Sequence, residues 1–403
     1  MFNTNMLYMS NLICSLDLGN DYIKWVLFLE DYDQKKSIIA KELIKSKWIK
    51  KWKILDSSSL INSISAVLDH LSSKVDSPID EVIVWLSHPY MKIKKLSTHK
   101  RLTNLEITTK EINNLLESIS LEADELNYEI LKIMPIKWII DDTHTTQNPV
   151  GMEWRKLEVI ANVFMIPTTI YKDLEKIFDE LEIDIIDIIP NILWAEEGSL
   201  DIETKDLWCV LIDIGANQTS YSIYEEGVNL DYWIIPIGGE EITKDISIGL
   251  KIDFLQAEQI KKEEWEIILN KSDTNIKDSK IDKLFLSEII EARLAEDIYK
   301  PILQRMKELW VAGKLPGGIL LIWWGSKIRN IEEFTRDYFG LACKHWKIIQ
   351  EEFKDLWSNP QFVNVIWNYI WEDKYWNEWG GFGFNFNFGW GFSKLVELIK
   401  KIF

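Results

Sequence analysis

Apolar and polar positions along the chain follow two different periods, which together predict a mixed α/β fold. Uncharged apolar runs of strand length mark buried strands, and positions that recur every three or four residues mark amphipathic helices. The predicted strands lie at 82–87, 157–166, 183–190 and at the start of the segment 318–328 (GILLIWWGSKI). The predicted helices lie near 57–74 and at 109–126, 168–183, 238–250, 254–269, 281–312 and 326–339, of which 281–312 is expected to be one long helix.

Two segments far apart in the sequence share one pattern. SLDLGNDYIKWVLFLED (15–31) and VLIDIGANQTSYSIYEEG (210–227) each give an apolar strand, Asp-x-Gly, a short polar turn and a second strand. The chain therefore is expected to consist of two related halves, each opening with the same hairpin.

A hairpin of this kind suits phosphate chemistry. Its glycine lets the backbone turn sharply and approach a ligand, so that amide groups can point at phosphate oxygens. Its aspartate can hold Mg²⁺ through water, because Mg²⁺ keeps most of its hydration shell. A single Asp-x-Gly turn is a weak signal, whereas two in matching hairpins, at Asp17/Gly19 and Asp213/Gly215, are a stronger one.

Composition narrows the class of protein. A length of 403 residues predicts two or more domains, and a net charge of −18 excludes bulk attraction to nucleic acid. The 3 cysteines form no pairing motif, which favours a reducing compartment. The first residues have no signal-peptide pattern, and no apolar stretch is long enough to span a bilayer.

The end of the chain has a different character. Residues 372–391 are rich in Gly, Asn and aromatic residues without any period, and are interpreted as a linker. Residues 392–403 (FSKLVELIKKIF) predict a short amphipathic helix with a net positive charge, which favours a membrane-surface anchor over packing on its own domain. The residues expected to contact the membrane are Phe392, Leu395, Val396, Ile399, Lys400, Lys401, Ile402 and Phe403.

The paired hairpins resemble those of the actin-like ATPase superfamily, and IIPIGGEEITKDISIGLKIDFLQAEQIKKEEW (234–265) resembles the FtsA family of cell-division proteins within it. Segments 46–56 and 148–159 and the terminal helix also match the family, so the resemblance covers about 12–371 and the tail. It implies an α/β, actin-like (ribonuclease H-like), two-lobed ATPase fold with an FtsA-type insertion subdomain.

The resemblance also implies a domain plan. The first-lobe core is expected at 12–85 and 164–206, with the inserted subdomain at 86–163. The second-lobe core is expected at 207–239 and 313–371, with a small subdomain at 240–312.

The resemblance further implies ATP and Mg²⁺ as ligands, held between the two halves. Mg²⁺ would be bound through water by Asp17 and Asp213. The implied nucleotide-binding residues are Asp17, Gly19 and Asn20 in the first loop, Asp213, Gly215, Ala216, Asn217 and Thr219 in the second, Gly238 and Gly239, Glu258 and Lys261 at the ribose and adenine, and Gly325, Ser326 and Lys327 in the adenine-side loop. Asn20 replaces a hydroxyl residue that is usual in the family. Without the family pattern, Glu258 and Lys261 would be interpreted as a solvated i,i+3 pair.

By resemblance the protein polymerises at the cytoplasmic membrane face of the division site and binds the C-terminal peptide of FtsZ on 240–312, alongside other divisome proteins. Hydrolysis of ATP is expected to be slow, and no residue is identified as a catalytic base. The closest alternative is a PilM-like pilus-assembly protein, against which the terminal helix argues. A sugar kinase of the same fold would need a catalytic aspartate in a closed sugar cleft, and no motif for one is found. A chaperone of this superfamily would need a peptide-binding β domain after the ATPase lobes, and the sequence pattern predicts none there.

Tryptophan is unusually common, with 20 residues against only 18 glycines. Many of these tryptophans stand where the FtsA family has glycine, and a large side chain in a close-packed glycine site costs about 1–3 kcal/mol. Some bacterial lineages read the codon UGA as glycine, so we hypothesise that many of these residues are glycine in the cell; the rival explanation is a divergent homologue with rebuilt aromatic sites. The tryptophans at family glycine positions are Trp48, Trp52, Trp154, Trp208, Trp265, Trp323, Trp324 and Trp367. Trp85 and Trp346 are expected to belong to the same group. The family pattern does not decide whether Trp25, Trp138, Trp194, Trp233, Trp310 and Trp357 do.

Overall fold

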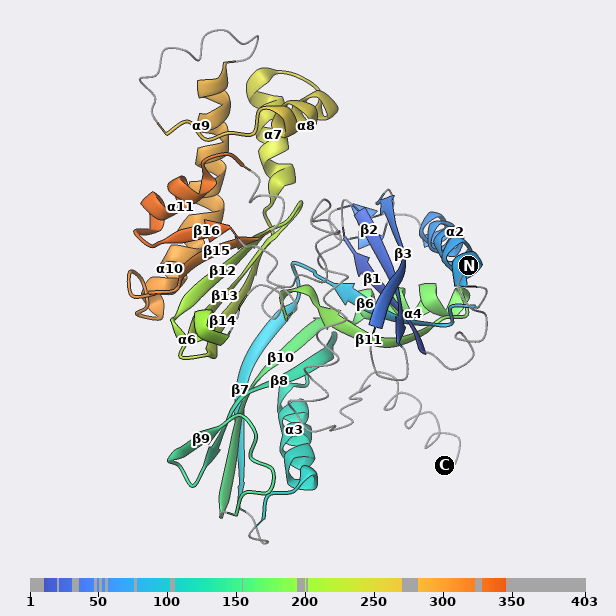
Figure 1. Cartoon of the computed structure of the whole chain (residues 1–403), viewed down its shortest axis with the longest axis vertical. Coiled ribbons are helices and arrows are strands. Elements are labelled where there is room, and N and C mark those ends of the chain that lie inside the picture. Colours follow the sequence, from blue (N-terminus) through green and yellow to red (C-terminus); the bar gives the residue numbers. More distant parts are fainter. Residues whose placement is uncertain are drawn as a thin grey trace. The chain divides into compact units, whose positions relative to one another are not determined.

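The described part of the chain forms two compact units, the first made of residues up to 193 and the second of residues from 200 onward. They are drawn in a computed structural model (Figure 1). The described residues are 11–19, 22–30, 36–46, 49–50, 53–54, 57–75, 78–101, 106–153, 155–193, 200, 202–269, 282–322 and 328–345. Among them, no helix combines the length and the apolar character needed to cross a membrane.

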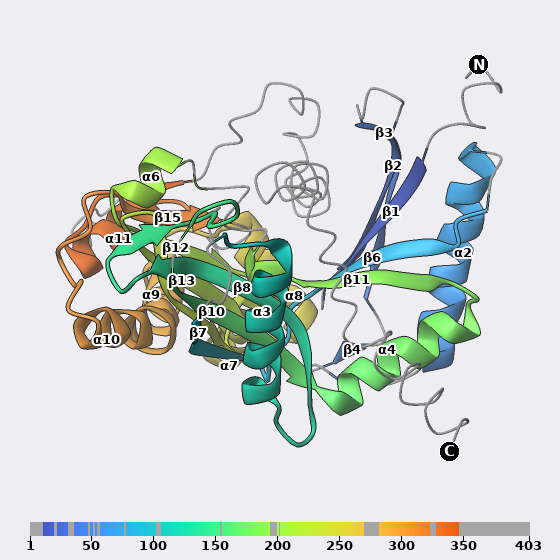
Figure 2. The same ribbon diagram turned by 90° about the horizontal axis from the view of Figure 1, so that it is seen from below.

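The first unit contains a five-stranded sheet with the strand order β11-β6-β1-β2-β3. The strands β1, β2 and β3 form an antiparallel meander, and β6 and β11 add to β1 in parallel. The helices α2 and α4 contact each other and the sheet, and lie on one side of it (Figure 2). The elements are β1 (Asn11–Leu18), β2 (Tyr22–Glu30), β3 (Lys36–Lys45), the short hairpin β4 (Ile49–Lys50) and β5 (Lys53–Ile54), α2 (Ser57–Val75), β6 (Glu81–Leu86), α4 (Thr168–Glu180) and β11 (Asp184–Pro190).

An inserted subdomain follows β6 within the same unit. Its sheet has the order β7-β10-β8-β9, with all pairs antiparallel. One face is covered by α3, whose buried residues Leu115, Leu116 and Ile119 pack with the sheet in one hydrophobic core. The elements are β7 (Lys92–Arg101), α3 (Thr109–Ala123), β8 (Tyr128–Ile140), β9 (His144–Thr146) and β10 (Lys156–Pro167).

The second unit repeats the strand plan of the first sheet. Its order β14-β13-β12-β15-β16 again combines an antiparallel meander, β12 to β14, with two strands added in parallel, β15 and β16. The strands are β12 (Cys209–Ile214), β13 (Thr219–Glu225), β14 (Val228–Ile235), β15 (Gly318–Ile322) and β16 (Cys343–His345). The equivalence of β1–β2 with β12–β13 confirms that the chain has two related halves that each open with the predicted hairpin.

The second unit also contains helices, most of which pack into one continuous core with its sheet, while α6 contacts β13. They are α6 (Ile202–Asp206), α7 (Gly239–Leu250), α8 (Phe254–Glu263), α9 (Lys283–Arg293), the π-helical segment η2 (Leu294–Tyr299), α10 (Lys300–Glu308) and α11 (Ile331–Phe339). Figure 1 shows α7, α8 and α9 grouped together beyond one end of the sheet.

Three predicted helices differ from the observed ones. The helix expected at 254–269 ends at Glu263, because the next residues pair with another segment: Ile267 N–H donates to Arg329 O at 3.0 Å, and Arg329 N–H donates to Trp265 O at 3.0 Å. The helix expected at 326–339 begins only at Ile331 in the described residues.

The helix expected at 281–312 is not uniform. Its described part is continuous from Lys283 to Glu308 but passes through the π segment η2. Pro301 has no N–H and cannot make the i→i−4 bond of an α-helix, and the N–H of the preceding residue, Lys300, reaches back five residues to Ala295 O. The apolar period predicts a helix here, but it does not predict the wider π-helical turn beside Pro301.

Candidate functional site

The turn between β12 and β13 lies against the first turn of α7 in the second unit. Gly215 N–H donates to Gln218 O at 2.9 Å, which closes the turn. Gly239 N–H then donates to Gly215 O at 3.0 Å, and Glu240 N–H donates to Ala216 O at 2.7 Å. The structure therefore brings together two motifs that the sequence separates by more than twenty residues.

Gly238 is required at this contact by lack of space. A Cβ built at this position would lie 2.5 Å from Gly215 O, 2.7 Å from Ala216 O and 2.7 Å from Gln218 N. All three atoms belong to the backbone, so none can rotate away. Gly239 differs, since the nearest atom to its Cβ position would be Lys261 Nζ at 3.6 Å.

The turn leaves few groups for a ligand. The amides of Gly215, Gly239 and Glu240 are used within the protein, whereas within the described part of the chain the amides of Ala216 and Asn217 make no hydrogen bond. The Oδ1 atom of Asn217 is buried and has no hydrogen-bond partner among the same residues. The Thr219 hydroxyl is buried and donates to Ile237 O at 2.9 Å, so it links the start of β13 to the segment that precedes α7.

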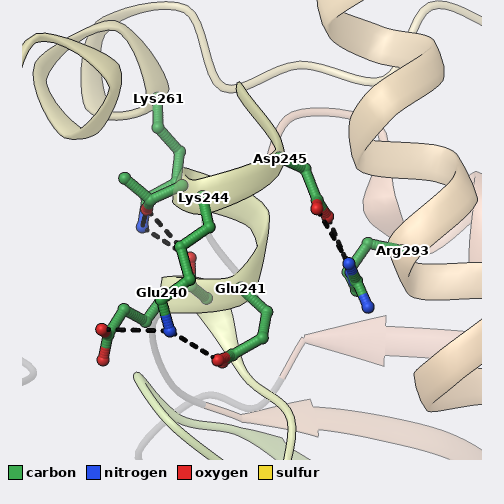
Figure 3. A network of polar contacts seen from close by, with 8 residues as sticks. Glu240, Glu241, Lys244, Asp245, Lys261 and Arg293 are labelled. Carbon is green, nitrogen blue, oxygen red and sulfur yellow. Dashed lines mark hydrogen bonds and ion pairs between the residues drawn. The ribbon is translucent and has the colours of Figure 1, made fainter. Parts of the chain in front are cut away.

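A buried polar network continues from this turn to α8. Lys261 is only 5% exposed, and its Nζ donates to Gly239 O at 3.0 Å and to Thr243 Oγ1 at 2.7 Å. The same Nζ lies 2.7 Å from Glu258 Oε2, which also accepts from Thr243 Oγ1 at 2.6 Å. Figure 3 shows Lys261 reaching down from α8 toward the first turn of α7.

The electrostatic state of Glu258 follows from this network. Burial alone would raise the pKa of its carboxyl, but the charge of Lys261 and the hydrogen bonds from Lys261 and Thr243 outweigh burial and lower the pKa below its ordinary value. The indole ring of Trp265 lies beside the network, with Lys261 Nζ 5.0 Å from the ring centroid. Glu258 and Lys261 are thus not the solvated pair that their spacing alone suggests.

A second ion pair fixes α7 to the end of α9. Arg293 donates from Nε to Asp245 Oδ2 at 2.7 Å and from Nη2 to Asp245 Oδ1 at 2.8 Å, a bidentate arrangement (Figure 3). Lys244 on the neighbouring face of α7 pairs with Glu240 and Glu241. The helix α7 is therefore fixed to α8 by Lys261 at Gly239 and to α9 by Arg293 at Asp245.

The corresponding turn in the first unit follows β1. Asp17 is buried, and its carboxylate lies 2.5 Å from Lys24 Nζ, which is also buried. Asn191 Nδ2 donates to the other carboxylate oxygen at 3.2 Å. Gly19 has no room for a side chain, since a Cβ there would lie 2.4 Å from Tyr22 O.

Sequence reasoning missed three polar residues of these two regions: Lys24, Asn191 and Thr243. The signal for Lys24 was available, because a tight hairpin pairs Asp17 directly with Lys24. The equivalent pair in the second hairpin is Asp213 with Ser220, so the two turns differ in charge.

Several predicted site residues lie outside the described residues. They are Asn20, Gly325, Ser326 and Lys327, together with the linker 372–391 and the membrane-anchor residues of 392–403.

The residues of the second unit fit a nucleotide in part. Two neighbouring turn amides and one buried amide oxygen without partners are the kind of groups that a phosphate and its hydrated cation engage. No group of three His, Cys, Asp or Glu side chains in the described ranges could hold a metal ion directly.

Solved structures similar to this chain identify the class. One is the PilM-PilN type IV pilus biogenesis complex, with a TM-score of 0.64 and 14% identity, covering 89% of this chain and 97% of that chain. Another is MreB 5 of Spiroplasma citri bound to AMPPNP, with a TM-score of 0.52 and 15% identity, covering 90% of this chain and 96% of that chain. At these identities the likeness concerns the fold alone. The fold is that of the actin-like ATPases, with an inserted subdomain.

The family follows from sequence comparison. The family model "Cell division protein FtsA" matches residues 210–366, and "SHS2 domain inserted in FTSA" matches residues 90–165. The cell division protein FtsA of Bacillus subtilis is 28% identical over 83% of this chain and 77% of its own length. That of Streptococcus pneumoniae is 26% identical over 87% of this chain and 78% of its own length. The chain belongs to the FtsA family of cell-division proteins.

Proposed function

We propose that this protein binds ATP with Mg²⁺, polymerises on the cytoplasmic membrane face at the division site, and tethers FtsZ there. The membership of the FtsA family supports a cell-division role for an actin-like protein. The local geometry bears on nucleotide binding and on FtsZ binding, and the sequence pattern of 392–403 bears on membrane attachment. Each of these three parts has its own test.

Nucleotide binding is supported by the contact between the β12–β13 turn and the start of α7. Gly238 allows the two backbones to touch, and Glu258 and Lys261 border the same helix turn. This is the observation that carries the proposal, because the second phosphate loop, the glycine pair and Glu258 with Lys261, which the family resemblance assigns to the nucleotide, contact one another within the second unit.

ATP would supply a polyphosphate whose binding favours the polymerising state. The amides of Ala216 and Asn217 are available to a phosphate, and Asp213 would hold the hydrated Mg²⁺ in the second unit. The family resemblance gives Asp17 the same role in the first unit, where its carboxylate is paired with buried Lys24. Lys261 would exchange part of its internal hydrogen bonding for the nucleotide. The contacts of Lys261 Nζ with Gly239 O and Glu258 hold the ammonium group in a fixed position.

Nucleotide binding can be tested with two neighbouring lysines of α8. Lys261→Met removes the buried ammonium, whereas Lys262→Met removes an ammonium that is 46% exposed and also contacts Glu258. We expect Lys261→Met to weaken binding of a fluorescent ATP analogue about tenfold or more, because hydrogen bonds to a charged group are worth about 1.5–3 kcal/mol. Lys262→Met should change it by less than about twofold, because exposed ion pairs contribute little.

Circular dichroism melts of both variants serve as the folding control. Equal affinity of a folded Lys261→Met variant and the unchanged protein would contradict the assignment of Lys261 to the nucleotide.

Binding of an FtsZ peptide is supported by exposed apolar side chains on the small subdomain. Ile248 in α7 and Leu255 in α8 are 75% and 77% exposed, and Phe254 and Phe285 are partly exposed. Single exposed apolar residues are common, but several on one helical subdomain suit a partner peptide with apolar anchors.

Leu255→Asp tests this surface, with Leu121→Asp as the matched control. Leu121 is 72% exposed on α3 of the inserted subdomain, so both variants exchange an exposed helical leucine for the same charge. We expect only Leu255→Asp to weaken binding of a synthetic C-terminal FtsZ peptide in fluorescence anisotropy. Equal effects of the two variants would exclude α8 as the docking site.

Membrane attachment rests on the sequence pattern of 392–403, outside the described residues. Deletion of 392–403 should abolish co-sedimentation with vesicles that contain anionic phospholipid, because the apolar face and the lysines of this helix are lost together. Lys400→Glu with Lys401→Glu should weaken co-sedimentation at low salt while keeping the apolar face. Undiminished sedimentation of the deletion variant would remove the basis for the anchor.

A further inference from the structure

Two tryptophans of the second unit have a left-handed backbone, which side chains other than glycine adopt at a cost. The φ angles are 58° at Trp208 and 62° at Trp310. Glycine takes this conformation freely, whereas a residue with a Cβ pays about the equivalent of a five- to thirtyfold change in an equilibrium constant.

Trp310 stands at the position after the end of α10 where glycine is most common. Trp310 N–H donates to Lys307 O at 3.0 Å, and Val311 N–H donates to Met306 O at 3.0 Å. This pair of bonds defines a Schellman motif, and Val311 and Met306 are both buried in the same hydrophobic core. The indole itself is 81% exposed and contributes little packing.

Trp208 stands at the equivalent position after α6. Its N–H donates to Lys205 O at 3.3 Å, and its own carbonyl accepts from Gly317 N–H at 3.0 Å. The chain then enters β12 directly, so the left-handed residue sets the direction of the strand that leads to Asp213.

The same position at other helix ends holds different residues. Glu182 after α4 and Lys251 after α7 are also left-handed, with φ of 56° and 55°, and Gly340 follows α11. A left-handed helix end therefore does not by itself require glycine here. The composition gives a second observation. Tryptophan, with 20 residues, outnumbers glycine, with 18, and Trp208 and Trp310 occupy the left-handed positions after α6 and α10.

We propose that the working protein carries glycine at positions 208 and 310, through UGA codons that the cell reads as glycine and that the written sequence renders as tryptophan. The inference concerns the identity of residues and stands apart from nucleotide binding. It does not extend to Trp265, whose backbone is not left-handed and whose side chain is buried in the core of the second unit.

Trp138 provides the contrast within the chain. It lies in the extended strand β8, is completely buried, and fills the core of the inserted subdomain against α3. Glycine there would leave a large cavity. The structure therefore assigns a genuine tryptophan, encoded by UGG, to position 138.

Peptide mass spectrometry of the protein isolated from its own cells tests the proposal, read together with the codons of the gene. We expect peptides with glycine at 208 and 310 and tryptophan at 138. Tryptophan in the peptides at 208 and 310, or UGG at these positions and at 154, 323 and 324, would overturn it. Glycine at 138 would equally overturn it, because the structural distinction between the two kinds of site would fail.

A recombinant comparison gives an independent measurement. Trp310→Gly in the full chain should raise the equilibrium constant for folding about two- to tenfold, because relief of the left-handed strain is partly offset by the greater freedom of glycine in the unfolded chain. Trp138→Gly should lower the folding constant more than about a hundredfold. A loss of stability in Trp310→Gly would contradict the assignment of glycine to this helix end.

Discussion

The contact at Gly238 allows a sharp test of how the candidate site is assembled. The φ and ψ of Gly238 are −150° and −159°, an extended conformation that alanine also adopts, so Gly238→Ala introduces no backbone strain. The cost comes only from the added methyl group, which would lie within 2.7 Å of three backbone atoms of the β12–β13 turn. Overpacking of this kind costs about 1–3 kcal/mol, and a rigid backbone neighbour places it in the upper half of that range.

Gly239→Ala is the matched control. Its Cβ would make ordinary contacts at 3.6 Å or more, and alanine in a helix is favoured over glycine by about 0.5–1 kcal/mol. Alanine also reduces the entropy of the unfolded chain at both positions, which offsets about 0.4–1 kcal/mol. Because this entropy term is common to both variants and the helix preference favours Gly239→Ala, the two variants are expected to differ by about 2.5–4 kcal/mol in the free energy of unfolding, with Gly238→Ala the less stable.

The assay is urea denaturation of the full chain followed by circular dichroism, with the transition that changes between the variants assigned to the second unit. Binding of a fluorescent ATP analogue supplies a second readout, since a displaced turn should also weaken nucleotide binding. Two variants with free energies of unfolding within about 0.5 kcal/mol would refute the reasoning, because that is the effect of an ordinary surface change.

Two further predictions concern the charges around α7. Glu258→Gln should cost about 1–2 kcal/mol near neutral pH; because the pKa of Glu258 is lowered in the folded protein, this difference is present above the ordinary value of 4.5 and should shrink as the pH falls through the lowered pKa, as measured by denaturation at several pH values. A difference that grows as the pH falls would contradict the assigned network. Arg293→Lys keeps the charge but loses the bidentate contact with Asp245, and should lower the melting temperature by an amount that corresponds to about 1 kcal/mol; an unchanged melting temperature would show that the fork geometry contributes nothing.

The halves of the fold could be predicted because the hairpin signal is local. Asp-x-Gly between two apolar runs fixes a turn and two strands, and its repetition predicts the repeated sheet. The strands of the inserted subdomain are harder to predict from the sequence. The strand β7 (KIKKLSTHKR) lies at a sheet edge and has no buried residue, so it lacks the apolar alternation of a buried strand. Its pairing with β10 is a long-range property that no local pattern states.

The polar site shows the same division between local and distant causes. The spacing of Glu258 and Lys261 predicts only that they share a helix face, and a shared face is usually solvated. What buries Lys261 comes from elsewhere in the chain: the carbonyl of Gly239 accepts its hydrogen bond, and Trp265 covers it after α8 ends. The carbonyl of Gly239 is held in place because Gly238 lets the backbone of α7 touch the turn after Asp213. A buried lysine is stable only when its charge is compensated, and Glu258 provides that compensation with a lowered pKa. Each member of the network therefore depends on a residue that its own sequence neighbourhood does not reveal, and only the family pattern could have joined them before the structure.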